Sequence, residues 1–356
     1  MMQEENRHKR LIMRAALQPG LSGADREPGI THTNLRGQMS EKQRLNRILE
    51  AAAALRDAHH FDEAAKMLSD AALDPEVGAL GPLTSLGLPR RLQSAMLKLA
   101  KRQGDPIARI AYQYHLVPPP DLLAGFAQFT LKERRAITDC NRQPVPRVLH
   151  QIWIGNLPPP PACAAWENHA RAQGYEYRLW RQDDLDRIGL GANSAFSTML
   201  AEGDYPGAVD VARYQILERE GGIYLDCDWY PARDDISFHD LLPMIGLTAM
   251  AEDIPRNTGV GGLLLANSMI ATPPGHPVMQ RLNSILTDVM RAIPKAPAWW
   301  STGPLIFTLV ARGGTVTLTD ARLVVGNLTQ GAHPDEVAAL AGDPSRTGLL
   351  IGWKSW

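Results

Sequence analysis

The stretch AVDVARYQILEREGGIYLDCD, residues 208–228, places a helix, its end and a strand in immediate succession. Val209, Ala212 and Ile216 recur at helical spacing, after Pro206-Gly207 opens the segment. Gly221-Gly222 then ends the helix, and residues 223–225 predict a buried strand. The sequence Asp-Cys-Asp follows directly, so polar groups stand where a strand finishes.

Around this stretch, short apolar runs alternate with helical segments from residue 141 onward. The runs expected to form strands are residues 148–154, 175–180, 223–225, 247–251 and 260–265. This alternation predicts an α/β domain over 141–356 with a largely parallel sheet. In such domains ligands bind beyond the carboxyl ends of the strands. The residues that close each run are therefore the candidates for function.

The N-terminal part has a different composition. Residues 1–40 contain a segment rich in Gly, Pro, Thr and Asn without apolar periodicity, which predicts a flexible N-terminal segment. Residues 41–140 are rich in Ala and Leu and predict an all-α helical domain. Within it, HFDEAAKML (60–68) resembles part of a tetratricopeptide helical pair, but no second copy occurs at that spacing, which favours a plain helical hairpin.

Charge and cysteine content limit the classes of partner. The 37 basic and 38 acidic residues nearly cancel, which gives no general attraction to nucleic acid or to an anionic membrane. The three cysteines form neither a disulfide framework nor a zinc motif, so a reducing compartment is expected. The N-terminus lacks the apolar core of a signal peptide, and no run approaches the roughly 18 apolar residues of a membrane span. We expect a cytoplasmic protein without a transmembrane segment, compatible with peripheral membrane contact.

Asp226 and Asp228 are the central candidates. In an extended chain both side chains would face one side and Cys227 the other. Two converging carboxylates suit Mn²⁺ or Mg²⁺, which keeps open positions for diphosphate oxygens. Two ordinary carboxylates at a strand end are the plainer interpretation, since a lone DxD is common. A phosphohydrolase of the haloacid dehalogenase type is a third, but its motif has Thr or Val where Trp229-Tyr230 follows here.

The preceding helix carries a second pair. Asp210 and Arg213 are i,i+3 neighbours, which is compatible with an ordinary helical ion pair. The functional alternative is that Asp210 receives the hydroxyls of a bound ligand while Arg213 orients it. The residues alone leave both open.

The stretch 208–228, together with PRVLHQIWIG (146–155), resembles the DXD-containing sugar transferases. That family includes yeast initiating α-mannosyltransferases and bacterial capsular polysaccharide enzymes, with a distant similarity to glucosylating toxins. The resemblance covers roughly residues 145–326. It implies a GT-A-like nucleotide-sugar-binding domain, a nucleotide diphosphate sugar donor linked to UDP or GDP, Mn²⁺ or Mg²⁺, and retention of anomeric configuration.

The resemblance also implies roles for individual residues. Asp228 would be the direct metal ligand and Asp226 would touch the donor and share the metal site, both as catalytic residues. Asp210 and Arg213 would hold the donor. Trp153 would lie near the nucleotide base, where an indole can stack, although its apolar surroundings equally suit a core position.

Further candidates lie toward the C-terminus. Ser355-Trp356 resembles a tail that in relatives folds over the diphosphate, but the His that accompanies it there is absent, and the tail could simply cover the core. Four further candidates for acceptor or sugar contacts, each explained nearly as well by loop or capping roles, are Glu252, Asp253, Asn267 and Thr302.

The sequence thus predicts a hexosyltransferase, with polysaccharide biosynthesis as one setting. Its acceptor would be a glycan, a lipid-linked glycan or a protein, and nucleic acid is not expected as a partner. The competing hypothesis is a helical interaction protein or effector with a degenerate transferase domain. The phosphohydrolase is the third.

Overall fold

The computed structural model describes residues 41–78, 80, 83–84, 86–116, 120–252, 264–294, 296–343 and 345–356. The predicted flexible segment 1–40 and the candidate Asp253 lie outside these residues. The chain divides into two compact units, with the first ending at Pro119 and the second comprising Pro120–Ile254 and Gly262–Trp356.

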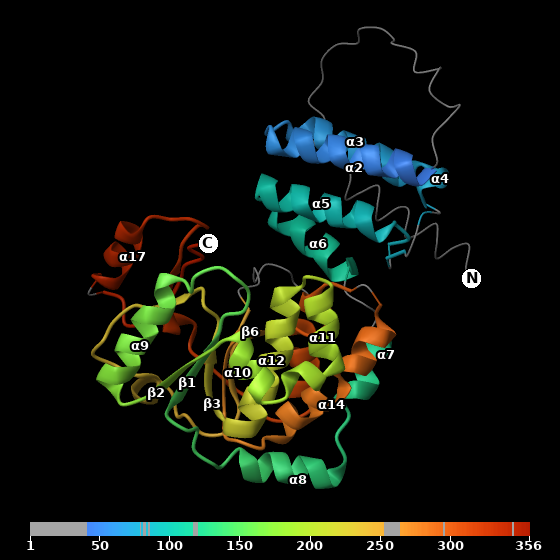
Figure 1. Cartoon of the computed structure of the whole chain (residues 1–356). Helices are drawn as coiled ribbons and strands as arrows, with labels where there is room; N and C mark the ends of the chain where they lie inside the picture. Colours follow the sequence, from blue (N-terminus) through green and yellow to red (C-terminus); the bar gives the residue numbers. More distant parts are fainter. Residues whose placement is uncertain are drawn as a thin grey trace, which may run out of the picture. The chain divides into compact units, whose positions relative to one another are not determined.

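The first unit is helical, as predicted. Its elements are α2 (Glu41–Asp57), α3 (Phe61–Leu73), α4 (Pro75–Gly78), α5 (Arg90–Gln103) and α6 (Pro106–Leu116). Helices α2 and α3 lie side by side (Figure 1), which is the helical hairpin that the sequence favours. Apolar positions at helical spacing on α2, α3 and α5 form the core, including Leu45, Leu68, Leu92 and Met96.

The second unit contains the other helices of the described residues. They are α7 (Pro120–Leu123), η1 (Ala124–Ala127), α8 (Leu131–Cys140), α9 (Pro161–Gln173), α10 (Gln182–Arg187), η2 (Leu190–Ala192), α11 (Ser194–Ala201), α12 (Tyr205–Glu220), α13 (Phe238–Leu241), α14 (Pro277–Ala292), α15 (Ala298–Ser301), α16 (Pro304–Ala311), η4 (Ala321–Leu323) and α17 (Pro334–Ala341). This unit begins at Pro120, 21 residues before the expected start at residue 141, because α8 packs on it: Glu133 pairs with Arg281 of α14 at 2.5 Å.

Six strands form the main sheet, in the order β2-β1-β3-β6-β5-β7. Their bounds are β1 Val148–Ile152, β2 Glu176–Trp180, β3 Gly222–Leu225, β5 Thr248–Ala251, β6 Leu265–Thr272 and β7 Thr317–Leu318. Strand β1 is parallel to β2 and β3, and β5 is parallel to β7, but β6 is antiparallel to both β3 and β5. Five of the six strands therefore run in the same direction, which agrees with the expectation of a largely parallel sheet, but β6 is reversed and makes the sheet mixed. An apolar run looks the same in either direction, so its pattern carries no information on strand polarity.

A second, three-stranded sheet was not predicted. It has the order β4-β9-β8, with β4 at Trp229–Pro231, β8 at Val324–Asn327 and β9 at Leu350–Gly352. Strands this short show too few alternations to be detected from sequence. The antiparallel pairing of β4 with β9 sets Trp229 opposite Gly352 and brings the C-terminal tail beside the Asp-Cys-Asp segment.

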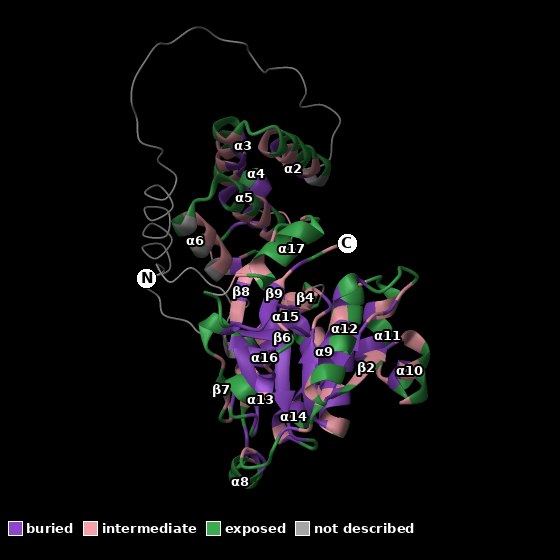
Figure 2. Cartoon of the chain, turned by 90° about the vertical axis from the view of Figure 1, so that its left-hand side faces the viewer, coloured by how far each residue is buried: buried purple, intermediate pink, exposed green. Residues whose placement is uncertain are grey.

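Helices cover both faces of the main sheet, with α9 on one face and α12 and α14 on the other (Figure 1). The central strands β1, β3 and β6 are almost wholly buried (Figure 2), and Leu149, Ile223 and Met269 are fully so, whereas β2 is largely half-buried and β7 is exposed. None of the helices in the described part of the chain is long and apolar enough to cross a membrane.

Candidate functional site

Gly221 and Gly222 join α12 to β3 without an intervening loop. Their φ angles are 65° and 95°, in the region that glycine adopts readily. A Cβ on Gly222 would stand 2.7 Å from the Val148 carbonyl oxygen, and one on Gly221 would stand 2.6 Å from the Pro274 nitrogen. The chain can thus pass directly from helix to central strand, so α12 side chains lie beside the carboxyl end of β3.

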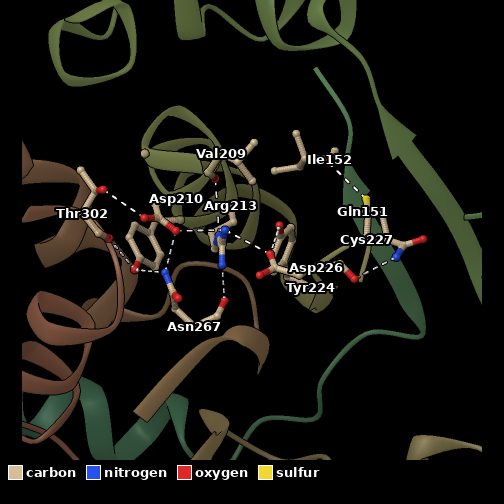
Figure 3. Close-up of polar contacts among 12 residues, drawn as sticks. Gln151, Ile152, Val209, Asp210, Arg213, Tyr224, Asp226, Cys227, Asn267 and Thr302 are labelled. Atoms are coloured by element: carbon tan, nitrogen blue, oxygen red, sulfur yellow. Dashed lines mark hydrogen bonds and ion pairs between the residues drawn. The ribbon is translucent and has the colours of Figure 1, made fainter. Parts of the chain in front are cut away.

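Asp210 on α12 is the centre of a buried polar network (Figure 3). Its carboxylate pairs with Arg213 Nη2 at 2.9 Å and accepts hydrogen bonds from Asn267 Nδ2 at 2.8 Å and Thr302 Oγ1 at 3.0 Å. Burial raises the pKa of Asp210 to about 6, while Arg213 acts in the opposite direction. Side chains from α12, β6 and the end of α15 are thereby fixed relative to one another.

Arg213 connects this network to the Asp-Cys-Asp segment. Its Nη2 lies 3.1 Å from Asp226 Oδ1, its Nη1 donates to the Asn267 carbonyl at 2.5 Å, and the guanidinium lies 4.5 Å from the centre of the Tyr224 ring. Burial works against its charge, but the neighbouring Asp226 carboxylate and Tyr224 raise the pKa of Arg213 above its ordinary value. The side chain is thus a permanent buried cation between two carboxylates.

Residues 226–228 form a turn, because the chain leaves one sheet at Leu225 and enters the other at Trp229. The Trp229 N–H donates to the Asp226 carbonyl at 3.2 Å. The extended alternation expected for Asp226 and Asp228 is therefore wrong. Asp226 Oδ1 accepts from the Tyr224 hydroxyl at 2.7 Å, and the Cys227 thiol donates to the Ile152 carbonyl at 3.3 Å.

Asp228 lies in the same turn and is held by the C-terminal tail, because its carbonyl accepts from the Trp353 N–H at 2.7 Å. Burial and the nearby Asp226 carboxylate raise the pKa of Asp228 to about 7, against the influence of Arg213 and Lys354. Arg213 is already shared between Asp210 and Asp226, so the turn is short of positive charge. A pair of oxygen ligands in this state fits a hard divalent cation.

No group of three or more His, Cys, Asp and Glu side chains suited to a metal occurs among the described residues. A cation at Asp226 and Asp228 would therefore need its remaining ligands from water or from a bound substrate, as Mg²⁺ commonly does at phosphate sites.

The structure brings Trp153 and Trp356 together beyond the end of β1. Their ring centres are 4.9 Å apart in an edge-to-face arrangement, and Trp153 Nε1 donates to the Leu157 carbonyl at 2.8 Å. Gln330 Nε2 donates to the Trp356 carbonyl at 2.9 Å. The Ser355 hydroxyl is buried and has no partner in the described structure. The tail thus links the predicted base contact to the Asp228 turn.

The remaining candidates are placed as follows. Asn267 and Thr302 are buried and use their side chains to hold Asp210, whereas Glu252 follows β5 and is half-buried. Three residues of the network were not among the candidates: Tyr224, Gln151 and Tyr214, whose hydroxyl accepts from Asn267 Nδ2 at 3.1 Å and donates to the Thr302 carbonyl at 2.8 Å. Tyr224 could have been found, because it stands two residues before Asp226, and Gln151 is a polar residue inside an apolar run.

Residues 165–243, which include α12, β3 and the turn, match the family model described as "Glycosyltransferase sugar-binding region containing DXD motif". The resemblance to DXD-containing sugar transferases is confirmed for this segment. Asp210, Arg213, Asp226 and Asp228 all lie within it.

Two curated relatives come from Schizosaccharomyces pombe. The chain is 27% identical over 179 residues to inositol phosphoceramide mannosyltransferase 3, covering 47% of this chain and 44% of that protein. It is 28% identical over 178 residues to inositol phosphoceramide mannosyltransferase 1, covering 46% and 50%. The match thus spans about half the length of these relatives.

Among solved structures, the chain is similar to the PaToxG glycosyltransferase. That match has a TM-score of 0.38 and 16% identity, and covers 54% of this chain and 76% of the other.

Proposed function

We propose that the second unit is a metal-dependent glycosyltransferase of GT-A-like architecture. It would transfer a hexose from a UDP- or GDP-linked sugar with retention of configuration. The observation that carries the proposal is the buried ion-pair network Asp210–Arg213–Asp226 beside Asp228, within a segment that matches a DXD sugar-binding region.

In this proposal Asp226 and Asp228 hold Mn²⁺ or Mg²⁺, which when bound neutralises charge on the diphosphate of the donor. Arg213 keeps the Asp226 carboxylate in one orientation, and Asp210, tied to Asn267 and Thr302, keeps Arg213 in place. Because these groups are ordered before the donor arrives, the reaction avoids the cost of reorganising them. Trp153 and Trp356 supply ring surfaces against which a nucleotide base can pack.

For the acceptor, a glycan, a lipid-linked glycan and a protein side chain are the proposed classes. The names of the two S. pombe relatives favour mannose as the sugar and a lipid-borne acceptor. We propose a cytoplasmic setting with peripheral access to such a lipid, and the few, scattered cysteines of the chain agree with a reducing compartment.

The test is thermal unfolding of the purified protein with UDP- and GDP-sugars, with and without Mn²⁺, because a ligand that binds the native state raises the unfolding temperature. We expect metal-dependent protection by one nucleotide class, abolished in Asp228→Ala. The matched control is Asp335→Ala, which removes a carboxylate that is 91% exposed and should leave the protection intact. No protection by any donor would contradict the proposal and favour the interaction-protein hypothesis.

A further inference from the structure

Gln151 on β1 is a fully buried amide with both ends engaged. Its Oε1 accepts from the Tyr177 hydroxyl at 2.9 Å, and its Nε2 donates to the Asp226 carbonyl at 3.2 Å. Tyr177 belongs to β2, so the chain of contacts runs from β2 through β1 to the turn. Figure 3 shows the amide of Gln151 directed at this turn. A buried amide is costly unless it is hydrogen-bonded, so this geometry is strongly specified.

The contact lies where the backbone ladder stops. Strand β1 pairs with β3 through Leu149 with Ile223 and His150 with Tyr224, and the pairing does not extend to Asp226. On the opposite side, the Asp226 N–H donates to the Ser268 carbonyl of β6 at 2.8 Å. Gln151 therefore donates a hydrogen bond from β1 to Asp226 at a point where the backbone pairing of β1 with β3 has ended. The backbone of Asp226 is held from β6 at its N–H and from β1 at its carbonyl.

The Asp226 carbonyl belongs to the peptide that leads into the turn, so a restraint on it fixes the path of the chain from Asp226 to Asp228. Loss of this restraint would change that path and with it the placement of the two carboxylates relative to each other. A second contact, from the Cys227 thiol to Ile152, joins the turn to the same strand but is weaker, because a thiol is a poor donor. Gln151 is thus the principal side-chain restraint from β1 on this turn.

We propose that Gln151, oriented by Tyr177, is a positioning residue for the Asp226–Asp228 turn and sets the affinity of the site for metal and donor. The proposal rests on the function proposed above, because it assigns Gln151 a part in that same site. Both ends of the Gln151 amide are engaged within the protein, so in this proposal it acts through the turn and not by direct contact with metal or donor.

The test is Gln151→Met, which preserves the approximate volume of the side chain and removes the donor. We expect Mn²⁺ and nucleotide-sugar affinities to fall at least tenfold, and the KM for the donor to rise more than kcat falls. Tyr177→Phe keeps the amide but frees its far end, and should give a smaller change in the same direction. This second variant keeps the proposal testable if Gln151→Met does not fold.

The chain offers a matched control in Gln93, which is also fully buried and donates through Nε2 to a backbone carbonyl, that of Tyr112, at 2.8 Å. It belongs to the helical unit. Gln93 Oε1 is buried without a hydrogen-bond partner in the described structure, so Gln93→Met removes one hydrogen bond where Gln151→Met removes two. Gln93→Met should lower thermal stability by a smaller amount and leave metal and donor affinity unchanged. Equal loss of affinity in both variants would overturn the proposal, because the effect would then follow from stability alone.

A second readout does not depend on donor binding. Cys227 is buried in the turn, and Cys140 is buried at the end of α8. In Gln151→Met, alkylation of Cys227 by iodoacetamide, followed by mass spectrometry, should become several-fold faster than in the wild type, with Cys140 unchanged. If the wild type binds no donor but Cys227 is alkylated faster in Gln151→Met, the proposed function is wrong, while the restraint of the turn by Gln151 is supported. Wild-type donor affinity together with unchanged Cys227 alkylation would overturn the role of Gln151.

Discussion

At the scale of single residues, Arg213 holds several groups of the site in place. One guanidinium contacts the carboxylates of Asp210 and Asp226 and the carbonyl of Asn267, and it is only 3% exposed. The planar fork of arginine can serve several acceptors in fixed directions, whereas the ammonium of lysine is a compact charge on a flexible stem. Arg213 on α12 is therefore not interchangeable with a lysine, although the two side chains carry the same charge.

Arg213→Lys should accordingly be a severe change. It leaves at least one buried carboxylate without its partner, and breaking such a pair costs about 3–5 kcal/mol. Urea unfolding gives the free energy directly. The control is Arg291→Lys, whose ion pair with Asp288 has side chains 73% and 58% exposed and should have little effect. Equal stabilities for the two variants would show that the network is not structurally important.

Two buried histidines make stability depend on pH. Burial lowers the pKa values of His150 and His276 to about 4, and both are tied as neutral rings, His150 to the Gly221 carbonyl at 3.0 Å and His276 to Asn141 Oδ1 at 3.1 Å. The unfolded chain takes up protons at these rings below about pH 6.5, whereas the folded chain does not. The stability that these two rings contribute is therefore lost as the pH falls from about 6.5 to about 4.

Between pH 7.5 and pH 5 we expect each of the two rings to lower the free energy of unfolding by roughly 2 kcal/mol, from about 1.4 kcal/mol per pKa unit. The raised pKa values of Asp210 and Asp228 act in the opposite direction over this range, because these carboxyls take up protons in the folded chain before they do so in the unfolded chain. The test is therefore a comparison by urea titration at the two pH values, in which His276→Gln should lose roughly 2 kcal/mol less than the wild type. An equal pH dependence in the two proteins would mean that the His276 ring is accessible to protons in the fold.

At the scale of elements, the junction between α12 and β3 determines how the site is built. Gly222→Ala would place a methyl group against the Val148 carbonyl and the His150 ring at a positive φ of 95°. We expect a loss of roughly 2–5 kcal/mol from backbone strain and overpacking together. Gly174→Ala has a similar φ of 69° but open space around its Cβ, and should cost only about 1–2 kcal/mol. Thermal or urea unfolding compares the two variants. Equal losses of stability would show that the steric clash at Gly222→Ala contributes nothing.

The elements also show what the sequence can and cannot reveal. The run 148–154 became β1 and 175–180 became β2, because β-branched, aliphatic and aromatic residues between turn signals specify a strand. The direction of β6 and the short strands β4, β8 and β9 could not be predicted. Neither the direction of a strand nor a pairing of three residues leaves a recognisable pattern in the sequence. The turn at Asp226–Asp228 was mistaken for extended chain for the same reason: it is caused by β4, which pairs with residues more than a hundred positions away.

At the scale of the whole molecule, the candidate site was predictable as a set of residues but not as a network. Asp210, Arg213, Asp226 and Asp228 came from one stretch with a recognisable motif. The partners that fix them come from separate parts of the chain: Gln151 from β1, Asn267 from β6 and Thr302 after α15. Such contacts depend on tertiary packing, which the local pattern of residues does not encode.

The division into units predicts how the chain can be cut. A fragment of Pro120–Trp356 should fold alone and show the same donor-dependent protection as the full chain. A fragment starting at Asn141 lacks Phe129 and Ile137, which are buried in this unit, and should be less stable by roughly 3–6 kcal/mol. Circular dichroism and urea unfolding test both. Unfolded Pro120–Trp356 would show that residues before Pro120 are needed.

The hydrogen bond from Trp353 to Asp228, with the pairing of β9 and β4, also has a consequence during protein synthesis. At about 5–20 residues per second, a ribosome needs roughly 6–25 s to proceed from Asp228 to β9. During that interval the Asp228 carbonyl has no Trp353 to bind, so a nascent chain carries an unfinished site. The proposed sugar transfer therefore begins only after translation has passed the last strand.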